Sequence, residues 1–198
     1  MRLPSPRQID ALREVANVGG GHAANAFSRL VGGQVVQIEV PVVNFEVASL
    51  VELLDGNSRL VGISFGILGE LTGRMLLVLA EPDAHALSAL LLHAPASKAL
   101  TATERSALCE AGNIVGSACL AAIGTLTGLK ILLSAPSLRA GTAEEVVQSA
   151  ESDVNAISTP MVVMQIHFFT AGSPHVRGQL ILMPERQSLA TLLSKLGL

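Results

Sequence analysis

Two short segments of the chain carry a glutamate that is followed three residues later by an asparagine. With the Asp or Ser that lies four residues before each glutamate, the residues are Asp10, Glu14 and Asn17 in the first segment and Ser106, Glu110 and Asn113 in the second. A carboxamide has no useful pKa near neutrality, so it is no ordinary general base, but it can donate one hydrogen bond and accept another. It can therefore hold a water molecule at a fixed angle to an electrophile. The pattern indicates chemistry in which water is positioned for attack.

Helical geometry would place each triad on one side of a helix. At about 100° per residue, positions i, i+4 and i+7 fall within an arc of roughly 60°, and apolar residues line the opposite side in both segments. Asn is a mediocre helix former, and Gly costs about 1 kcal/mol relative to Ala inside a helix. The run Asn17-Val18-Gly19-Gly20-Gly21 is therefore a poor choice for a plain surface helix. Small residues there predict close approach by another backbone, or a kink.

The two triads divide the chain into halves of similar organisation. Asn17 and Asn113 lie 96 positions apart in a chain of 198 residues, and a period of about half the length predicts an internal duplication. We expect one domain over residues 1–198, with the first repeat at about 6–94 and the second at about 101–198.

Hydrophobic periodicity and turn residues predict the same order of elements in both halves. In the first half we expect a helix at 6–31, a strand at 34–44 with Pro41 at an edge or bend, a short helix at 45–54, strands at 59–69 and 73–80, and a helix from Pro82 to about His93. In the second half we expect a helix at 102–127, a strand at 130–139, a short helix at 142–150, strands at 158–171 and 176–183 joined at Gly172-Ser173-Pro174, and a last helix opened by Pro184.

The second segment resembles a known motif in full. In the CheC/CheX/FliY phosphatases of bacterial and archaeal chemotaxis the motif is [D/S]-x3-E-x2-N-x22-P. Ser106, Glu110, Asn113 and Pro136 match it at every spacing. The surrounding EAGNIVGSACLAAIGTLTGLKILLSAPSL is also similar to the second repeat of that family.

The first segment resembles the other copy of the motif with one difference. Asp10, Glu14 and Asn17 match it, and NVGGGHAANAFSRLVGG is similar to the family's Asn-x-Gly-x-Gly stretch. Pro41 follows Asn17 after 23 intervening residues, one more than the family pattern has. The resemblance covers essentially the whole chain.

The resemblance implies a fold and an activity. The fold would be α+β, with two tandem α-β-α-β-β-α repeats about a pseudo-two-fold axis that share one antiparallel sheet and expose two long motif helices. The activity would be dephosphorylation of the phospho-aspartate of CheY-type receiver domains. Asn17 and Asn113 would align the attacking water, and Glu14 and Glu110 would pair with a receiver lysine. The phosphoryl group, its Mg²⁺ and that lysine would belong to the partner, so the chain would need no cofactor or metal of its own.

Other roles for these residues stay open. Asp10 and Ser106, one turn before the glutamates, are expected to support the site rather than to do chemistry. Asn17 and Asn113 could instead be capping or helix-breaking residues. The chain could also be chiefly a binding module for a receiver domain or for a CheD-like receptor deamidase, with the helix at 142–150 as a candidate contact. A FliY-like structural role in the flagellar switch is less favoured, because we expect the chain to end about where the phosphatase core ends.

Composition excludes several other classes of protein. A net charge of −3 argues against a nucleic-acid surface, which would be basic, and the absence of Trp and Tyr leaves no base-stacking platform. No apolar run reaches about 18 residues, so we expect no membrane insertion. Residues 1–10 lack the apolar core of a signal peptide. These features predict a cytoplasmic protein without a nucleic-acid partner.

Other candidate chemistry is weak. Cys109 and Cys119 would lie about 15 Å apart on one helix, and a disulfide needs Cα atoms within about 7 Å. The run from Gly19 to Ala24 fits the dinucleotide pattern G-x-G-x-x-A but lies inside a helical pattern, where that fingerprint needs a strand before it. The five histidines show no metal-ligand spacing.

Overall fold

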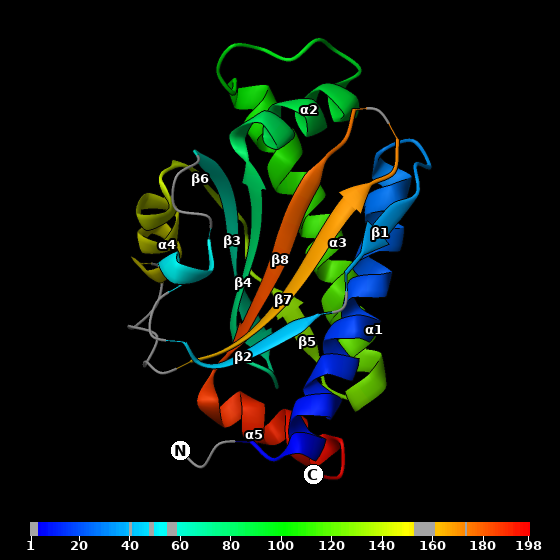
Figure 1. The fold of residues 1–198 in the computed structure, drawn as a ribbon, viewed down its shortest axis with the longest axis vertical. Coiled ribbons are helices and arrows are strands. Elements are labelled where there is room, and N and C mark those ends of the chain that lie inside the picture. Colours follow the sequence, from blue (N-terminus) through cyan, green and yellow to red (C-terminus); the bar gives the residue numbers. More distant parts are fainter. Residues whose placement is uncertain (1–3, 40, 48–49, 55–58, 153–160, 173) are drawn as a thin grey trace.

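The computed structural model describes the chain except residues 1–3, 40, 48–49, 55–58, 153–160 and 173 (Figure 1). The first half contains α1 (Pro6–Leu30), β1 (Val36–Ile38), β2 (Val42–Val47), the 3-10 helix η1 (Val51–Leu53), β3 (Leu60–Gly69), β4 (Gly73–Ala80) and α2 (Glu81–Leu92). The second half contains α3 (Ala102–Thr127), β5 (Ile131–Leu133), β6 (Ser137–Gly141), α4 (Ala143–Ser152), β7 (Met161–Thr170), β8 (Arg177–Pro184) and α5 (Arg186–Lys195).

Two of the predicted strands are each divided in two near a proline. The strand predicted at 34–44 is separated into β1 and β2 around Pro41, and the strand predicted at 130–139 is separated into β5 and β6 around Pro136. Proline has no N–H to donate to a sheet ladder, so it interrupts pairing within a strand.

The short helix predicted at 45–54 is wrong over its first residues. Strand β2 continues to Val47, which pairs with Met161 of β7, and in the part of this range that the structure describes the helical residues are the single turn of η1. Pairing with a strand more than 100 residues away overrode the local pattern, which is how tertiary context commonly acts on short segments. Of the joint predicted at 172–174, Ser173 lies outside the described residues.

Within the described residues, eight strands form one sheet in the order β1-β7-β8-β4-β3-β5, with β2 also beside β7 and β6 also beside β3. All of the pairings are antiparallel. If β1, β3 and β4 are exchanged with their counterparts β5, β7 and β8, the result is the same order read from the opposite edge of the sheet. The predicted α+β class with a shared antiparallel sheet is confirmed, whereas descent of the halves from one duplicated unit stays a prediction.

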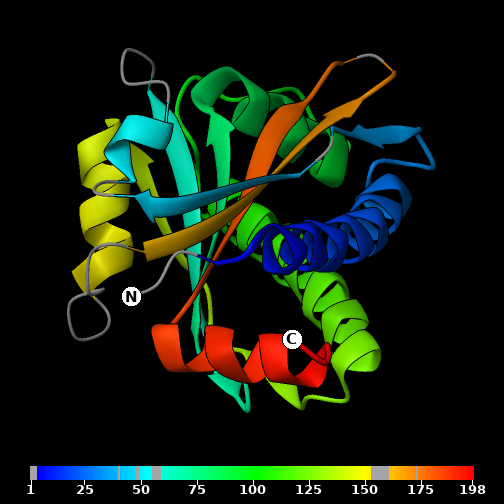
Figure 2. The ribbon, with the colours of Figure 1, turned by 60° about the horizontal axis from the view of Figure 1, so that its bottom comes forward.

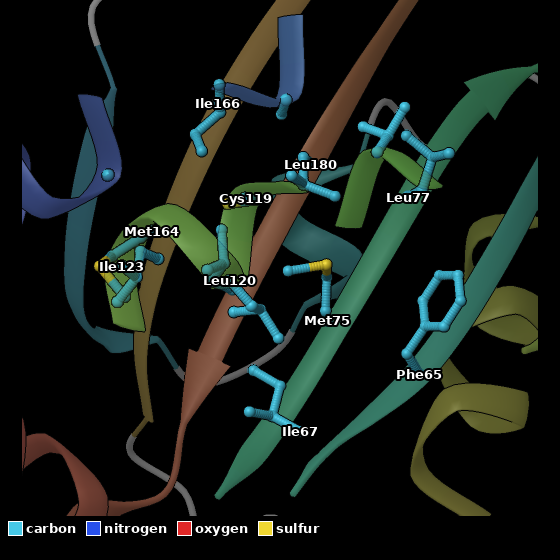
Figure 3. Close-up of a cluster of buried hydrophobic side chains, with 14 of the residues drawn as sticks. Phe65, Ile67, Met75, Leu77, Cys119, Leu120, Ile123, Met164, Ile166 and Leu180 are labelled. Carbon is cyan, nitrogen blue, oxygen red and sulfur yellow. The ribbon is translucent and has the colours of Figure 1, made fainter. Parts of the chain in front are cut away.

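The sheet separates two apolar cores. The larger lies between the sheet and the helices α1 and α3, and Figure 3 labels ten of its members: Phe65, Ile67, Met75, Leu77, Cys119, Leu120, Ile123, Met164, Ile166 and Leu180. The smaller lies on the other face, where η1 and α4 cover Leu60, Leu76, Val78 and Ile181. Because side chains alternate along a strand, neighbouring residues such as Met75 and Leu76 enter different cores. Burial of one such side chain contributes about 1.5–3 kcal/mol.

The two long helices begin in the same way. Ser5 caps α1 by accepting a hydrogen bond from the backbone N–H of Gln8, whose side chain accepts one from the N–H of Ser5 in return. Thr101 and Glu104 make the same reciprocal pair at the start of α3. Such capping boxes satisfy N–H groups that have no partner inside the helix. Helix α3 then ends at Gly128, whose φ of 71° is a left-handed conformation that glycine adopts without strain.

Helix α3 is the one helix in the described part of the chain that is long and apolar enough to cross a membrane, with a mean hydropathy of 1.4 over its most apolar window. Half of that window is buried inside the protein. Leu108, Val115 and Cys119 are at most 3% exposed, since they pack into the larger core. Helix α3 is accordingly a core helix of this fold.

Glu104 also holds the segment between the two halves in place through hydrogen bonds. Its carboxylate accepts hydrogen bonds from the hydroxyl and N–H of Ser97, from those of Thr101, and from the hydroxyl of Ser88 on α2. The Ser97 hydroxyl and the Thr101 donors lower the pKa of Glu104 from 4.5 to about 2. Bonds to the ionised form account for this direction.

Replacing Glu104 with Gln is expected to lower the melting temperature at neutral pH. A carboxylate whose pKa is lower in the folded state stabilises the fold above its ordinary pKa, and that stability is lost as pH falls from 4.5 towards about 2. The difference in melting temperature between parent and variant should therefore shrink over that range. Thermal unfolding at several pH values, with the exposed Glu39→Gln as control, measures it. A difference that is constant with pH would contradict the role given to the ionised carboxylate.

Candidate functional site

On α1 the first triad lies on the side that faces away from the core. Asp10, Glu14 and Asn17 are all exposed. Leu12 and Val15, which lie between them in sequence, are fully buried. The helical spacing predicted from the sequence therefore holds, and both the carboxylate and the carboxamide are available to a partner.

On α3 the second triad has the same arrangement with one difference in depth. Ser106 and Glu110 are exposed, and Asn113 is half-buried. Gly112 beside it is buried, and a Cβ there would lie 3.1 Å from the ring of Phe65 in the core. Close packing of α3 on the sheet thus brings this asparagine nearer to the body of the protein than Asn17.

The four predicted catalytic side chains have no bonding partner within the described part of the protein. Glu14, Asn17, Glu110 and Asn113 make no side-chain hydrogen bond or ion pair with any other residue that the structure describes. Glu14, Asn17 and Glu110 are exposed, so that solvent or a partner can satisfy their polar groups. A glutamate and an asparagine three residues apart have Cβ atoms about 5–6 Å from each other. Each pair can therefore make two contacts at the mouth of one site on a partner.

The two predicted supporting residues have different surroundings. Asp10 pairs with Arg13, its Oδ1 lying 3.1 Å from the arginine Nη1. The hydroxyl of Ser106 has no side-chain hydrogen bond to the residues that the structure describes. That these residues support Glu14 and Glu110 stays a prediction.

The two triads do not meet in one site. Helices α1 and α3 run in opposite directions and cross on the same face of the sheet (Figures 1 and 2). They meet where Gly19 faces Cys119 and Ile123. Both triads precede the crossing in their own helix, so they lie to either side of it. The chain presents two separate surfaces, each with one Glu–Asn pair.

Two of the cavities among the described residues have no triad residue in their linings. A small space of about 10 Å³ between α1, α3 and the sheet is lined by apolar side chains and Gly20, and its volume is about that of one water. An open cleft of about 600 Å³ lies at the far end of α3, between Leu120 and Leu132. Among the described residues no group of three or more His, Cys, Asp or Glu is placed to hold a metal ion.

Comparison with known proteins agrees with the motifs. The model of the CheC-like family matches residues 8–45, which include the first triad. The chain is 26% identical over 199 residues to the CheY-P phosphatase CheC of Bacillus subtilis (strain 168), covering 96% of this chain and 94% of that protein.

Solved structures agree with the fold. FliY of Thermotoga maritima superimposes with a TM-score of 0.74 at 16% identity, covering 98% of this chain and 97% of that one. The CheX–CheY–BeF3–Mg²⁺ complex of Borrelia burgdorferi contains a chain that matches with a TM-score of 0.58 at 12% identity, covering 85% and 96%. The sequence match and the shared fold together confirm the resemblance of this chain to the CheC/CheX/FliY family.

Proposed function

We propose that this chain is a phosphatase that hydrolyses the phospho-aspartate of CheY-type receiver domains in chemotaxis signalling. The observation that carries the proposal is the pair of outward-facing, uncommitted Glu–Asn sets, one on each long helix. The resemblance to a CheY-P phosphatase over most of the chain supports it. A fold neighbour solved together with CheY supports a receiver as the partner.

In the proposed reaction the helix enters the active site of the receiver. The carboxamide of Asn17 or Asn113 orients a water in line with the phosphorus atom, donating one hydrogen bond and accepting another. The water oxygen bonds to phosphorus as the bond to the aspartate oxygen breaks, giving inorganic phosphate and a free carboxylate. The water proton passes to a phosphoryl oxygen or to solvent, because the amide does not take it up. Positioning of this kind is the main contribution of a protein to phosphoryl transfer.

The glutamates fix the position of the receiver along each motif helix. Glu14 and Glu110 each present a free carboxylate about one turn from the asparagine on the same side of the helix. We assign to each an ion pair with the ammonium group of a receiver lysine, and we place the Mg²⁺ of the reaction on the receiver. The supporting roles of Asp10 and Ser106 belong to this proposal. A receiver substrate would place the chain in the cytoplasm.

Phosphate release is expected to accelerate when a small amount of this chain is added to a large molar excess of phosphorylated receiver. The rate should rise in proportion to the chain, with many turnovers per molecule, because the chain is not consumed. Continuous phosphate detection measures this, and receiver without the chain gives the background. Binding at a fixed ratio without acceleration would contradict the phosphatase and favour a binding module instead.

A further inference from the structure

Helix α1 holds an ion pair inside its triad. The guanidinium of Arg13 lies 3.1 Å from the carboxylate of Asp10, and the two side chains are 44% and 73% exposed. Glu14 follows Asp10 by four residues, so the two carboxylates are neighbours on the helix surface. Side chains on a helix lean towards its N-terminus, which brings the carboxylate of Glu14 over the turn that contains Asp10. Arg13 is thus placed to neutralise one of two adjacent negative charges.

Helix α3 also presents one free carboxylate in its triad, but it does so without an ion pair. A shift of 96 positions aligns Asp10 with Ser106 and Arg13 with Cys109. Serine is uncharged, and burial raises the pKa of the Cys109 thiol above its ordinary value of 9.0, so the thiol is neutral at physiological pH. Both charges are present in α1 and both are missing in α3. In each helix one carboxylate without an ion pair to a described residue is left beside the asparagine, Glu14 in α1 and Glu110 in α3.

We propose that Arg13 is a positioning residue of the α1 site, which pairs with Asp10 so that Glu14 alone is free to bind the receiver. This rests on the phosphatase function proposed above. Without Arg13, Asp10 would offer a second carboxylate one turn away and compete with Glu14 for the same ammonium group. It would also repel the anionic phosphoryl group of the partner. In α3 a serine at this position makes a neutralising cation unnecessary.

The test uses a chain in which only the α1 site acts, carrying Glu110→Ala and Asn113→Ala. In this background Arg13→Ala is compared with Arg13→Ala combined with Asp10→Ser, and with Arg13→Lys. Arg29→Ala removes an equal charge at an exposed position in the last turn of α1, about 18 Å from Asn17 along the helix axis. The probe is a receiver domain activated with beryllofluoride and Mg²⁺, whose Kd is measured by calorimetry. The kcat and KM for phosphorylated receiver are measured in parallel.

Arg13→Ala should weaken binding and raise KM by about two- to fivefold, the range of an exposed ion pair, with kcat nearly unchanged because Asn17 is intact. Adding Asp10→Ser should restore both values, Arg13→Lys should keep them, and Arg29→Ala should leave them as in the background chain. If Arg13→Ala with Asp10→Ser binds as weakly as Arg13→Ala alone, Arg13 contacts the receiver directly and the inference is overturned. Normal binding by Arg13→Ala would overturn it as well. If the chain without substitutions neither binds nor turns over the receiver, the proposed function itself fails.

Discussion

Replacing both Asn17 and Asn113 with alanine is expected to lower kcat/KM for the phosphorylated receiver by about 100- to 1,000-fold, the size of losing one group that acts on the transition state. The carboxamide orients the attacking water, and a methyl group can do nothing equivalent. The fold should survive, since neither side chain is bonded to another residue that the structure describes. Binding of beryllofluoride-activated receiver should change much less, because Glu14 and Glu110 remain.

The control is Asn25→Ala, which removes an exposed asparagine from the same helix two turns beyond Asn17. It should leave phosphate release unchanged. Of the single variants, Asn113→Ala is expected to cost at least as much as Asn17→Ala, because the second motif matches the family pattern in full. A double variant that hydrolyses the phosphorylated receiver at the parent rate would contradict the mechanism.

The local parts of this site could be predicted from the sequence. The spacing of Glu110 and Asn113 places them on one helical side, and the helix at 102–127 has the bounds that were predicted. Helical periodicity depends on neighbours three and four residues apart, so a local pattern carries it. The two capping boxes were also present as Ser5-x-x-Gln8 and Thr101-x-x-Glu104, a signature that marks a helix start. The Asp10–Arg13 pair was visible as an i, i+3 pair of opposite charges.

Other parts depend on contacts between distant residues, which no local pattern specifies. Val47 extends a strand because β7 accepts it across the sheet, although the surrounding residues suggested a short helix. The half-burial of Asn113 follows from packing of α3 on the sheet, which its sequence alone does not reveal. The glycine run after Asn17 predicted close approach without naming the neighbour. In the structure Gly19 faces α3 and Gly20 faces Ile38 and Ile166 of the sheet, and α1 continues through the glycines without interruption.

The crossing of the two helices at Gly19 holds both Glu–Asn pairs in place, because it fixes where each motif helix sits on the sheet. Gly19 is buried at the crossing, and a Cβ there would lie 2.8 Å from Sγ of Cys119 and 3.2 Å from the side chain of Ile123. Gly21, two residues on, has nothing within 4 Å of the equivalent position. Replacement by leucine should therefore destabilise the protein at Gly19 but not at Gly21.

Gly19→Leu is expected to lower the free energy of unfolding by about 1–3 kcal/mol, since overpacking forces α1 and α3 apart. For a chain of this length each kcal/mol shifts the melting temperature by about 2–4 °C. Gly21→Leu should instead leave stability unchanged or raise it by up to about 1 kcal/mol, because leucine is the better helix former. Thermal and denaturant unfolding of the two variants measure the contrast. Equal stabilities would mean that α1 and α3 do not pack through Gly19, and the crossing could not then be what separates the two sites.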